Sequence, residues 1–285
     1  MKIALIPNLT RACALQITTE VCDILDRLSV EYFFDEELRK DLPDTWSFLP
    51  SEKLFTICDI VIAIGGDGSL IHAAKKAVQY QKPILGINAG NLAFMAGIEK
   101  NELNLLEDLI VGRYETDHRM MLDVYYKPNK EAPMQCLGKC LNDVVIARGS
   151  QIKLITLDVF ADEKLVNHYY TDGIILSTPT GSTAYSLSAG GPVVDPTIES
   201  IILTPICTHS LFARSLIFEK NTEIVISIPN KEQEVNLSCD GDDAVPIQAG
   251  GVIYIRKSKE YADFIRIKND SFIDVLNSKL SQRRA

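Results

Sequence analysis

The first third of the chain alternates short apolar runs with segments of helical periodicity. Apolar runs typical of buried parallel strands occupy residues 2–6, 30–34, 59–64 and 84–87. After the first run, apolar residues recur at helical spacing at Ile17, Val21, Ile24, Leu25 and Leu28. Residues 69–80 and 101–111 are also expected to be helical. Strands that alternate with helices predict a doubly wound, Rossmann-like α/β domain over residues 1–120.

The pattern changes near residue 120, where short β-rich runs follow one another and long helical patterns are scarce. The predicted strands cover residues 122–126, 141–147, 153–160, 173–177, 224–228, 235–238, 252–256 and 264–267. We expect an all-β, sandwich-like domain over residues 121–268. Residues 269–285 form a C-terminal segment in this interpretation, with a helix that returns to the N-terminal domain.

Composition indicates a folded globular chain and excludes several classes of protein. Of the 285 residues, 46% are hydrophobic and 24% are charged, unlike a disordered chain, a collagen-like fibre or a coiled coil. The formal net charge of -9 argues against general nucleic-acid binding, which depends on clustered Lys and Arg. No segment approaches the roughly 20 apolar residues of a membrane helix, so we expect no membrane partner. The seven cysteines are scattered without a C-x-x-C pair, which is typical of reduced thiols in a cytoplasmic protein.

The sequence Ile64-Gly65-Gly66-Asp67-Gly68-Ser69 joins a predicted buried strand to a predicted helix. Glycines allow the backbone to approach a ligand closely, and N–H groups at the start of a helix bind anions. The stretch has neither the Walker A pattern nor the G-x-G-x-x-G spacing of dinucleotide-binding loops. Asp67 is unexpected in a phosphate loop, because a carboxylate repels phosphate unless it holds a metal or accepts a proton. The structural alternative is that Asp67 caps the helix.

A second candidate is the hydroxyl-rich stretch from Ser177 to Pro192. Eight of the twelve residues 177–188 carry a hydroxyl group. Such a segment has no apolar face for core packing, whereas many small donors and acceptors suit a polyol or nucleotide ligand. Tyr185 adds a ring on which a base can stack. The alternative is a structural loop with a short helix.

Three further polar turns lie next to predicted strands. Asn142-Asp143 starts a strand, Gly86-Ile87-Asn88-Ala89-Gly90 follows one, and Asp240-Gly241-Asp242-Asp243 lies between two. Ligands of open α/β sheets bind beyond the carboxyl ends of the strands, which favours the second of these turns. The other two are turn formers by default, and the acidic turn is also a candidate metal site.

Taken together, these stretches resemble the NAD kinase family. The family pattern consists of Gly-Gly-Asp-Gly after a strand, Gly-x-Asn-x-Gly-x-Leu-Gly-Phe, Asn-Glu and Thr-Pro-Thr-Gly-Ser-Thr-Ala-Tyr. The matching segments of this chain are, in order, residues 65–68, 86–94, 142–143 and 178–185. Asp143 replaces the commoner Glu, and Ala93 and Met95 replace Gly and Leu.

The resemblance implies transfer of the γ-phosphoryl group of ATP to the 2′-hydroxyl of the adenosine ribose of NAD, which gives NADP. Polyphosphate is a second donor in some members of the family. The resemblance also implies NAD and ATP as binding partners, Mg²⁺ or another divalent cation as cofactor, and a homodimer or homotetramer.

The position of each residue in the family pattern implies its role. Asp67 is the expected catalytic carboxylate, and the phosphate loop comprises Gly65, Gly66, Gly68 and Ser69. The expected substrate-binding residues are Asp67, Gly68, His72, Asn142, Asp143, Lys153, Asp172, Thr183, Ala184, Tyr185, Ser186, Leu187, Ser188 and Asp242. No residue is assigned as a metal ligand. The sequence leaves open whether Asp67 acts as a base, orients the hydroxyl or holds Mg²⁺.

Two alternatives to an NAD kinase remain at this point. A lipid-type kinase shares the Gly-Gly-Asp-Gly element but has no use for the hydroxyl-rich stretch. A non-catalytic NAD(P) sensor would bind the dinucleotide without turnover, and the intact Asp67 argues against it.

Overall fold

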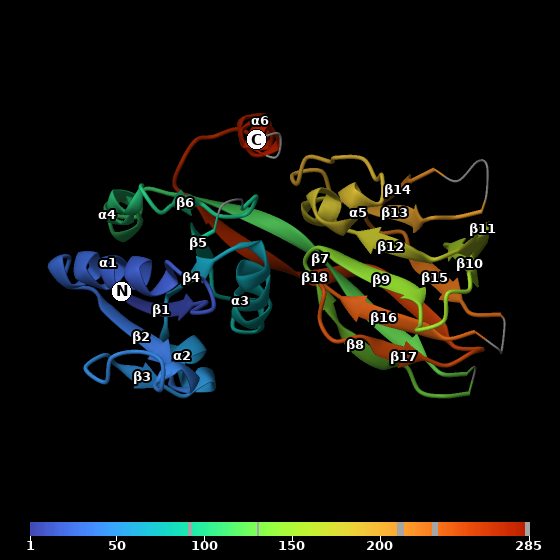
Figure 1. Cartoon of the computed structure of the whole chain (residues 1–285), viewed down its shortest axis with the longest axis horizontal. Coiled ribbons are helices and arrows are strands. Elements are labelled where there is room, and N and C mark those ends of the chain that lie inside the picture. Colours follow the sequence, from blue (N-terminus) through green and yellow to red (C-terminus); the bar gives the residue numbers. More distant parts are fainter. Residues whose placement is uncertain (91–92, 130, 210–213, 230–232, 283–285) are drawn as a thin grey trace. The chain divides into compact units, whose positions relative to one another are not determined.

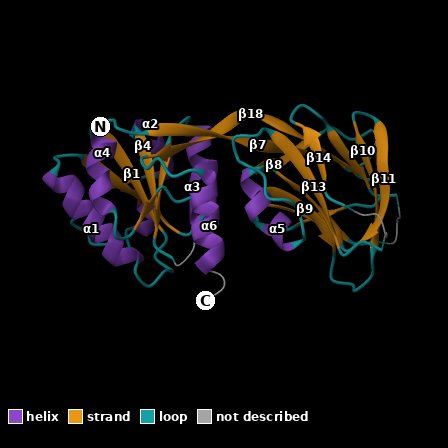
Figure 2. Cartoon of the chain, turned by 90° about the horizontal axis from the view of Figure 1, so that it is seen from above, coloured by secondary structure: helices purple, strands orange, loops and turns teal. Residues whose placement is uncertain are grey.

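The computed structural model describes residues 1–90, 93–129, 131–209, 214–229 and 233–282. The chain divides into two compact units (Figure 1). Unit 1 comprises Met1–His118 and Ala262–Ala285, and unit 2 comprises Arg119–Tyr261. Unit 1 contains most of the helices, whereas unit 2 is built mainly of strands (Figure 2). This architecture confirms the predicted fold class, an α/β part followed by a β-rich part.

Unit 1 contains an open parallel sheet with the strand order β5-β4-β1-β2-β3. Its strands are β1 (Lys2–Pro7), β2 (Glu31–Asp35), β3 (Phe48–Leu49), β4 (Ile60–Gly65) and β5 (Ile84–Asn88), and β6 (Ile98–Glu99) pairs with β5. Strand β1 lies between β2 and β4, so the chain leaves it first toward one side of the sheet and later toward the other. The carboxyl ends of β1 and β4 flank this switch point, where open α/β sheets bind ligands.

The helices of unit 1 are α1 (Ala14–Arg27), α2 (Ser51–Ile57), α3 (Asp67–Gln79), α4 (Leu106–Ile110) and α6 (Phe272–Gln282), with short 3₁₀ turns η1 (Glu36–Leu38) and η2 (Leu103–Leu105). Helices α1, α2 and α3 pack against strands of the parallel sheet, and buried leucines of α4 belong to the same apolar core. The helical spacing seen in the sequence buries Ile17, Val21 and Leu25 of α1, as predicted. Within the described part of the chain, no helix is both long and apolar enough to cross a membrane.

Unit 2 contains two sheets whose facing side chains form one apolar core. One sheet has the order β14-β13-β12-β9-β16-β17, and the other has β8-β7-β18-β15-β10-β11. The strands are β7 (Glu115–Lys127), β8 (Gln135–Cys140), β9 (Asp143–Arg148), β10 (Ile155–Ala161), β11 (Lys164–Thr171), β12 (Gly173–Ser177), β13 (Ser200–Ile206), β14 (Leu216–Glu219), β15 (Ile224–Ser227), β16 (Val235–Cys239), β17 (Val245–Ile247) and β18 (Val252–Arg266). Ile146 and Ile174 of the first sheet share the core with Leu157 and Ile255 of the second, as in a β-sandwich.

Two features of this region differ from the sequence prediction. The runs 252–256 and 264–267 are not separate strands but parts of the single strand β18, whose middle is polar. Since β18 and β7 continue from unit 2 into unit 1, unit 2 ends at Tyr261 and not at residue 268. The hydroxyl-rich stretch after β12 forms two short elements, η3 (Thr180–Thr183) and α5 (Tyr185–Ser188).

Candidate functional site

The glycine loop connects β4 to α3 at the switch point of the unit 1 sheet. Gly65 ends β4, and Gly66 precedes the first turn of α3. A Cβ atom at Gly65 would lie 2.6 Å from the Ser69 side chain, so glycine allows the strand and the helix to approach closely here. The Asn8 amide donates a hydrogen bond to the Ser69 hydroxyl (2.7 Å) and joins the end of β1 to the start of α3.

Asp67 lies in the first turn of α3, but its carboxylate does not cap the helix. Oδ2 accepts a hydrogen bond from the N–H of Phe94 (2.9 Å), and Oδ1 accepts one from the N–H of Met95 (3.0 Å). The capping alternative is therefore wrong, because the carboxylate instead orders the chain after β5. Burial raises the pKa of the Asp67 carboxyl, and the two hydrogen bonds oppose this in part. The result is a half-buried carboxylate with a fixed orientation.

A cavity of about 620 Å³ adjoins the start of α3. Gly68, Ser69 and His72 line it together with Asn8 and Thr10 from the segment that follows β1. His72 is exposed, as expected for a side chain one helical turn beyond the glycine loop. The structure thus brings three predicted residues together around one cavity.

The segment after β1 was missed by the sequence analysis. Thr10 donates hydrogen bonds from its N–H (3.1 Å) and its hydroxyl (2.7 Å) to Asn8 Oδ1, which fixes the turn. The Arg11 guanidinium lies 3.8 Å from the position that a Cβ atom of Gly66 would occupy, so a cation stands beside the glycine loop. The available signal was position alone, since this polar segment follows the first predicted strand of the sheet.

In unit 2, Asp240 fixes the backbone on which Asn142 and Asp143 lie. Its carboxylate accepts hydrogen bonds from the N–H groups of Leu141 (2.8 Å), Asn142 (2.7 Å) and Asp143 (3.0 Å). Asn142 is 8% exposed, and its buried Oδ1 atom has no hydrogen-bond partner among the described residues. A buried polar atom of this kind is costly unless a ligand or water satisfies it. It is the clearest sign of a ligand position in unit 2.

Asp143 is a buried carboxyl with a strongly shifted pKa. Burial and the negative charge of Asp240 together raise its pKa to about 7, and a hydrogen bond with the Tyr185 backbone opposes them. Asp143 therefore changes charge close to neutral pH. The contact with Tyr185 also ties this carboxyl to the hydroxyl-rich stretch.

About half of the hydroxyl-rich stretch turns inward. Thr178 donates its hydroxyl hydrogen bond to Leu141 O (2.6 Å), and Ser182 bonds Val194 O (3.2 Å). Ser186 is fully buried with its hydroxyl 3.0 Å from that of Thr204, and its contact with a ligand stays a prediction. These inward hydroxyls correct the expectation that the stretch has no packing role.

The remaining residues of the stretch are accessible. Tyr185 is 46% exposed, Ser188 is exposed, and Thr183, Ala184 and Leu187 are half-buried. These five follow directly on the segment that packs against Asn142. They are the part of the stretch that a ligand can reach.

The three more distant predicted residues lie on the surface of unit 2. Asp172 is half-buried and forms an ion pair with Arg148 (Nε to Oδ1, 2.6 Å), a partner that the sequence analysis did not identify. Lys153 and Asp242 are exposed. Exposure leaves both available to a ligand but gives no evidence of one.

The structure describes no cluster of three or more His, Cys, Asp or Glu side chains that could hold a metal ion. In the acidic turn 240–243, the Asp240 carboxylate already accepts hydrogen bonds from three N–H groups. A nucleotide-bound Mg²⁺ needs only one or two protein carboxylates, because phosphates and water fill its other positions. A cation that arrives with the nucleotide therefore needs no preformed cluster of protein ligands.

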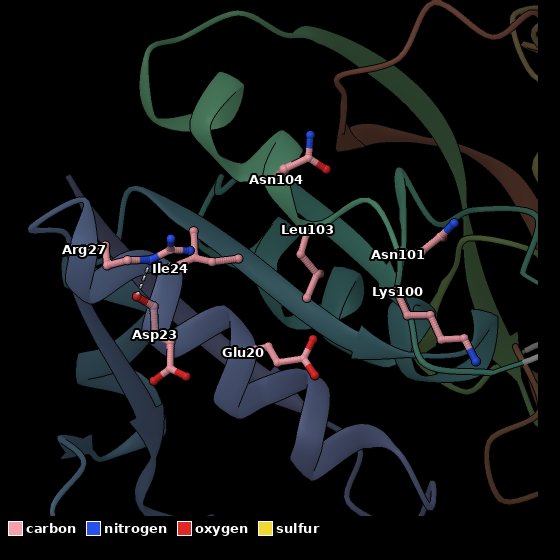
Figure 3. Close-up of a pocket in the computed structure, with 8 residues that line it drawn as sticks. All are labelled: Glu20, Asp23, Ile24, Arg27, Lys100, Asn101, Leu103 and Asn104. Atoms are coloured by element: carbon pink, nitrogen blue, oxygen red, sulfur yellow. Dashed lines mark hydrogen bonds between the residues drawn. The ribbon is translucent and has the colours of Figure 1, made fainter.

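A second cavity of unit 1, of about 670 Å³, has a different character (Figure 3). Glu20, Asp23 and Arg27 of α1 line it together with Lys100, and Arg27 bonds the backbone of Asp23 (3.4 Å). It contains none of the predicted site residues. Its opposite charges balance locally, so we do not include it in the candidate site.

Comparison with known proteins identifies relatives along the whole chain. Residues 3–114 match the ATP-NAD kinase N-terminal domain, and residues 141–267 match the ATP-NAD kinase C-terminal domain. An NAD kinase of a Thermoanaerobacter species is 35% identical over 99% of both chains. An NAD kinase of Legionella pneumophila is 36% identical over 90% of this chain and 88% of its own.

Solved structures with the same fold are also kinases of NAD or NADH. The crystal structure of yeast NADH kinase complexed with NADH superposes with a TM-score of 0.89 and 25% identity, covering 99% of this chain and 87% of the yeast chain. An NAD kinase from Archaeoglobus fulgidus in complex with ATP shares the fold, with a TM-score of 0.75, 24% identity and 99% coverage of both chains. Nothing in these matches supports a lipid-type kinase. The chain belongs to the NAD kinase family.

Proposed function

We propose that the chain transfers the γ-phosphoryl group of ATP to the 2′-hydroxyl of the adenosine ribose of NAD, and that Asp67 contacts the reacting hydroxyl. Its family makes the chain an NAD kinase, a phosphotransferase. The observation that carries the proposed role is the Asp67 carboxylate, which two backbone N–H groups orient at the carboxyl end of a buried strand.

Asp67 would orient the hydroxyl first and accept its proton later. Phosphoryl transfer depends mainly on positioning and charge neutralisation, and the proton leaves late in a loose transition state. Each Asp67 oxygen already accepts one hydrogen bond and keeps capacity for another, from the ribose hydroxyl. Because burial raises the pKa of Asp67, the carboxylate is also a better base than a solvated one.

The NAD-binding residues in this proposal come from unit 2. Asn142 and Asp143 would bind polar groups of the dinucleotide, and the unsatisfied Asn142 Oδ1 atom supports this role. The accessible residues of the hydroxyl-rich stretch would line the rest of the site, with the Tyr185 ring as a stacking surface. Asp172, Lys153 and Asp242 are proposed as outer contacts.

The donor phosphates would bind at the start of α3. The cavity lined by Gly68, Ser69 and His72 is at the N-terminal end of that helix, which favours anions. Arg11 adds a positive charge beside the loop. When bound, Mg²⁺ would supply further neutralisation of the phosphate charge. Both ATP and polyphosphate present the phosphate groups that this cavity would hold.

We also propose that the chain assembles as a homodimer or homotetramer. Large apolar side chains are exposed on unit 2, among them Ile152 (91%), Ile198 (55%) and Ile217 (56%). Burial of such side chains between copies would remove apolar surface from water. Sedimentation velocity of the purified chain would reveal the assembly, and a monomer at all concentrations would refute it.

The activity is tested by incubating the purified chain with NAD, ATP and Mg²⁺ and detecting NADP with an NADP-specific dehydrogenase. A parallel reaction contains polyphosphate in place of ATP. NADP formation with either donor supports the proposal and identifies the donor. If NADP does not form but calorimetry detects NAD binding, the chain is a sensor and the catalytic proposal is refuted.

A further inference from the structure

A buried ion pair connects the last helix of unit 1 with the loop that orients Asp67. We propose that Lys279, on α6, is a positioning residue for phosphoryl transfer and acts on Asp67 through Glu99 and Asn88. The inference rests on the proposed role of Asp67. It assigns a functional role to the C-terminal helix, which none of the motifs described above includes.

The ion pair itself is unusual in this chain. Lys279 Nζ lies 2.7 Å from Glu99 Oε1, and the Lys279 side chain is only 10% exposed. Removal of an ammonium group from water is costly unless a partner compensates it. Among the described side chains of α6, Lys279 is the one that is buried, whereas Ile273 is 57% exposed. A helix that buries a lysine and exposes an isoleucine is not placed by apolar packing alone.

Glu99 also connects Lys279 with β5, the strand that pairs with β4 before the glycine loop. Its Oε2 atom accepts a hydrogen bond from the Asn88 amide (2.8 Å), and Asn88 Oδ1 accepts one from the Gly90 N–H (2.8 Å). Asn88 pairs with Gly65 across β5 and β4, and Ala89 N–H donates to Gly65 O (2.9 Å). Phe94 and Met95, whose N–H groups bond the Asp67 carboxylate, follow Asn88 by six and seven residues in the sequence.

The charges of the pair also act on Asp67. Positive Lys279 lowers the pKa of the Asp67 carboxyl, and negative Glu99 raises it. These are the charged groups that face Asp67 from α6 and β6, and in the intact pair their effects oppose each other. Loss of Lys279 alone leaves Glu99 uncompensated and raises the pKa of Asp67 further, so less of the carboxylate is ionised at a given pH.

The test compares Lys279→Gln, Lys279→Arg and the double variant Lys279→Gln/Glu99→Gln in steady-state kinetics between pH 6 and pH 9. For Lys279→Gln we expect kcat to fall about 10-fold to 100-fold and KM for NAD to change by less than about twofold, because displacement of a catalytic group affects the chemical step. The acid limb of its kcat profile should move to higher pH. Lys279→Arg should recover most of kcat, and the double variant should return the acid limb toward the wild-type position.

The control is Arg113→Gln, which removes another ion pair of unit 1, between Arg113 and Asp108 (2.7 Å). It should leave the pH profile unchanged, since neither Arg113 nor Asp108 is among the main groups that shift the pKa of Asp67. If the wild type makes NADP but Lys279→Gln keeps its kcat and its pH profile, the inference is wrong and the proposed activity stands. If circular dichroism shows that Lys279→Gln fails to fold, the double variant is compared with the single variant Glu99→Gln. Glu99→Gln alone should move the acid limb to lower pH, because Lys279 then acts on Asp67 without an opposing charge. If the acid limb is displaced equally in both variants, Lys279 has no effect on Asp67 and the inference is overturned.

Discussion

The carboxyl groups of Asp67 and Asp143 have different acid–base properties because their surroundings differ. Burial raises the pKa of both. At Asp67, two backbone N–H groups stabilise the charged form, which suits a residue that must accept a hydrogen bond or a proton. At Asp143, the nearby charge of Asp240 adds to the effect of burial. Neither shift can be read from the sequence, because the groups that cause it are distant along the chain.

The first prediction concerns Asp143 and NAD affinity. In the free protein this carboxyl is mainly neutral below its pKa of about 7 and mainly ionised above it. Hydroxyl and amide groups of NAD donate more strongly to a carboxylate than to a neutral acid. We therefore expect affinity for NAD, measured by calorimetry, to increase between pH 6 and pH 8. Asp143→Asn should bind NAD with a flat pH dependence, and a variant that keeps the wild-type slope would exclude Asp143 as its origin.

At the scale of elements, the central strands and long helices were predictable, and the edges were not. Buried strands such as β4 are continuous apolar runs, and α1 has clear helical spacing. Strand β11 lies at the end of its sheet with exposed polar positions, so its sequence lacks a strong alternation. Because the middle of β18 is polar, the sequence pattern predicted two short strands where the structure has one long strand.

The site residues also differ in how far the sequence alone could identify them. Residues within recognisable motifs, such as Asp67 and Asn142, could be proposed from the sequence, because the motif is local in sequence. Arg148 was not assigned a role, and Asp240 was assigned only to a turn that is a candidate metal site, since each acts on a residue that only the fold brings near. The burial of the Ser186 hydroxyl was not predicted, because a count of hydroxyl groups cannot tell which of them turn inward.

The second prediction concerns the contact between η3 and the chain before β9. A Cβ atom at Gly181 would lie 2.1 Å from Asn142 O, closer than real contacts allow. Gly181→Ala should therefore displace one segment from the other, lower the free energy of unfolding by about 1–3 kcal/mol and weaken NAD binding. Thermal unfolding and calorimetry measure both effects. As a stability control, Gly68→Ala in helix α3 meets no atom within 4 Å and should not lower the Tm, since alanine favours a helix over glycine. A Tm of Gly181→Ala equal to that of the wild type would refute the steric argument.

At the scale of the whole molecule, the proposed site residues are divided between the two units. The proposed catalytic carboxylate belongs to unit 1 and the proposed NAD ligands belong to unit 2, and β7 and β18 run through both. Within unit 2, Glu199 links the two sheets. It precedes β13 and bonds Lys220, Lys257 (2.7 Å) and the Tyr261 hydroxyl (2.6 Å), the last two on β18.

The third prediction concerns acid stability. The partners of Glu199, first Lys220 and then Lys257 and Tyr261, lower its pKa to about 2 from an ordinary value of 4.5. A lowered pKa means that the stabilisation is present above pH 4.5 and is lost as the pH falls toward 2. Glu199→Gln should thus have a lower Tm than the wild type at pH 7 and a smaller decrease in Tm between pH 5 and pH 3. Parallel Tm curves for the two proteins over that range would contradict this account.

The central claim is that a carboxylate fixed by two backbone hydrogen bonds carries out the chemical step, and Asp67→Asn tests it most directly. The amide is similar in size, but it has one acceptor oxygen and cannot take a proton from the ribose hydroxyl. We expect turnover to fall by at least about 100-fold while the Kd for NAD stays close to that of the wild type. Asp23→Asn, an exposed carboxylate of the other cavity, should retain full turnover. A near-normal rate of NADP formation by Asp67→Asn would remove Asp67 from the mechanism.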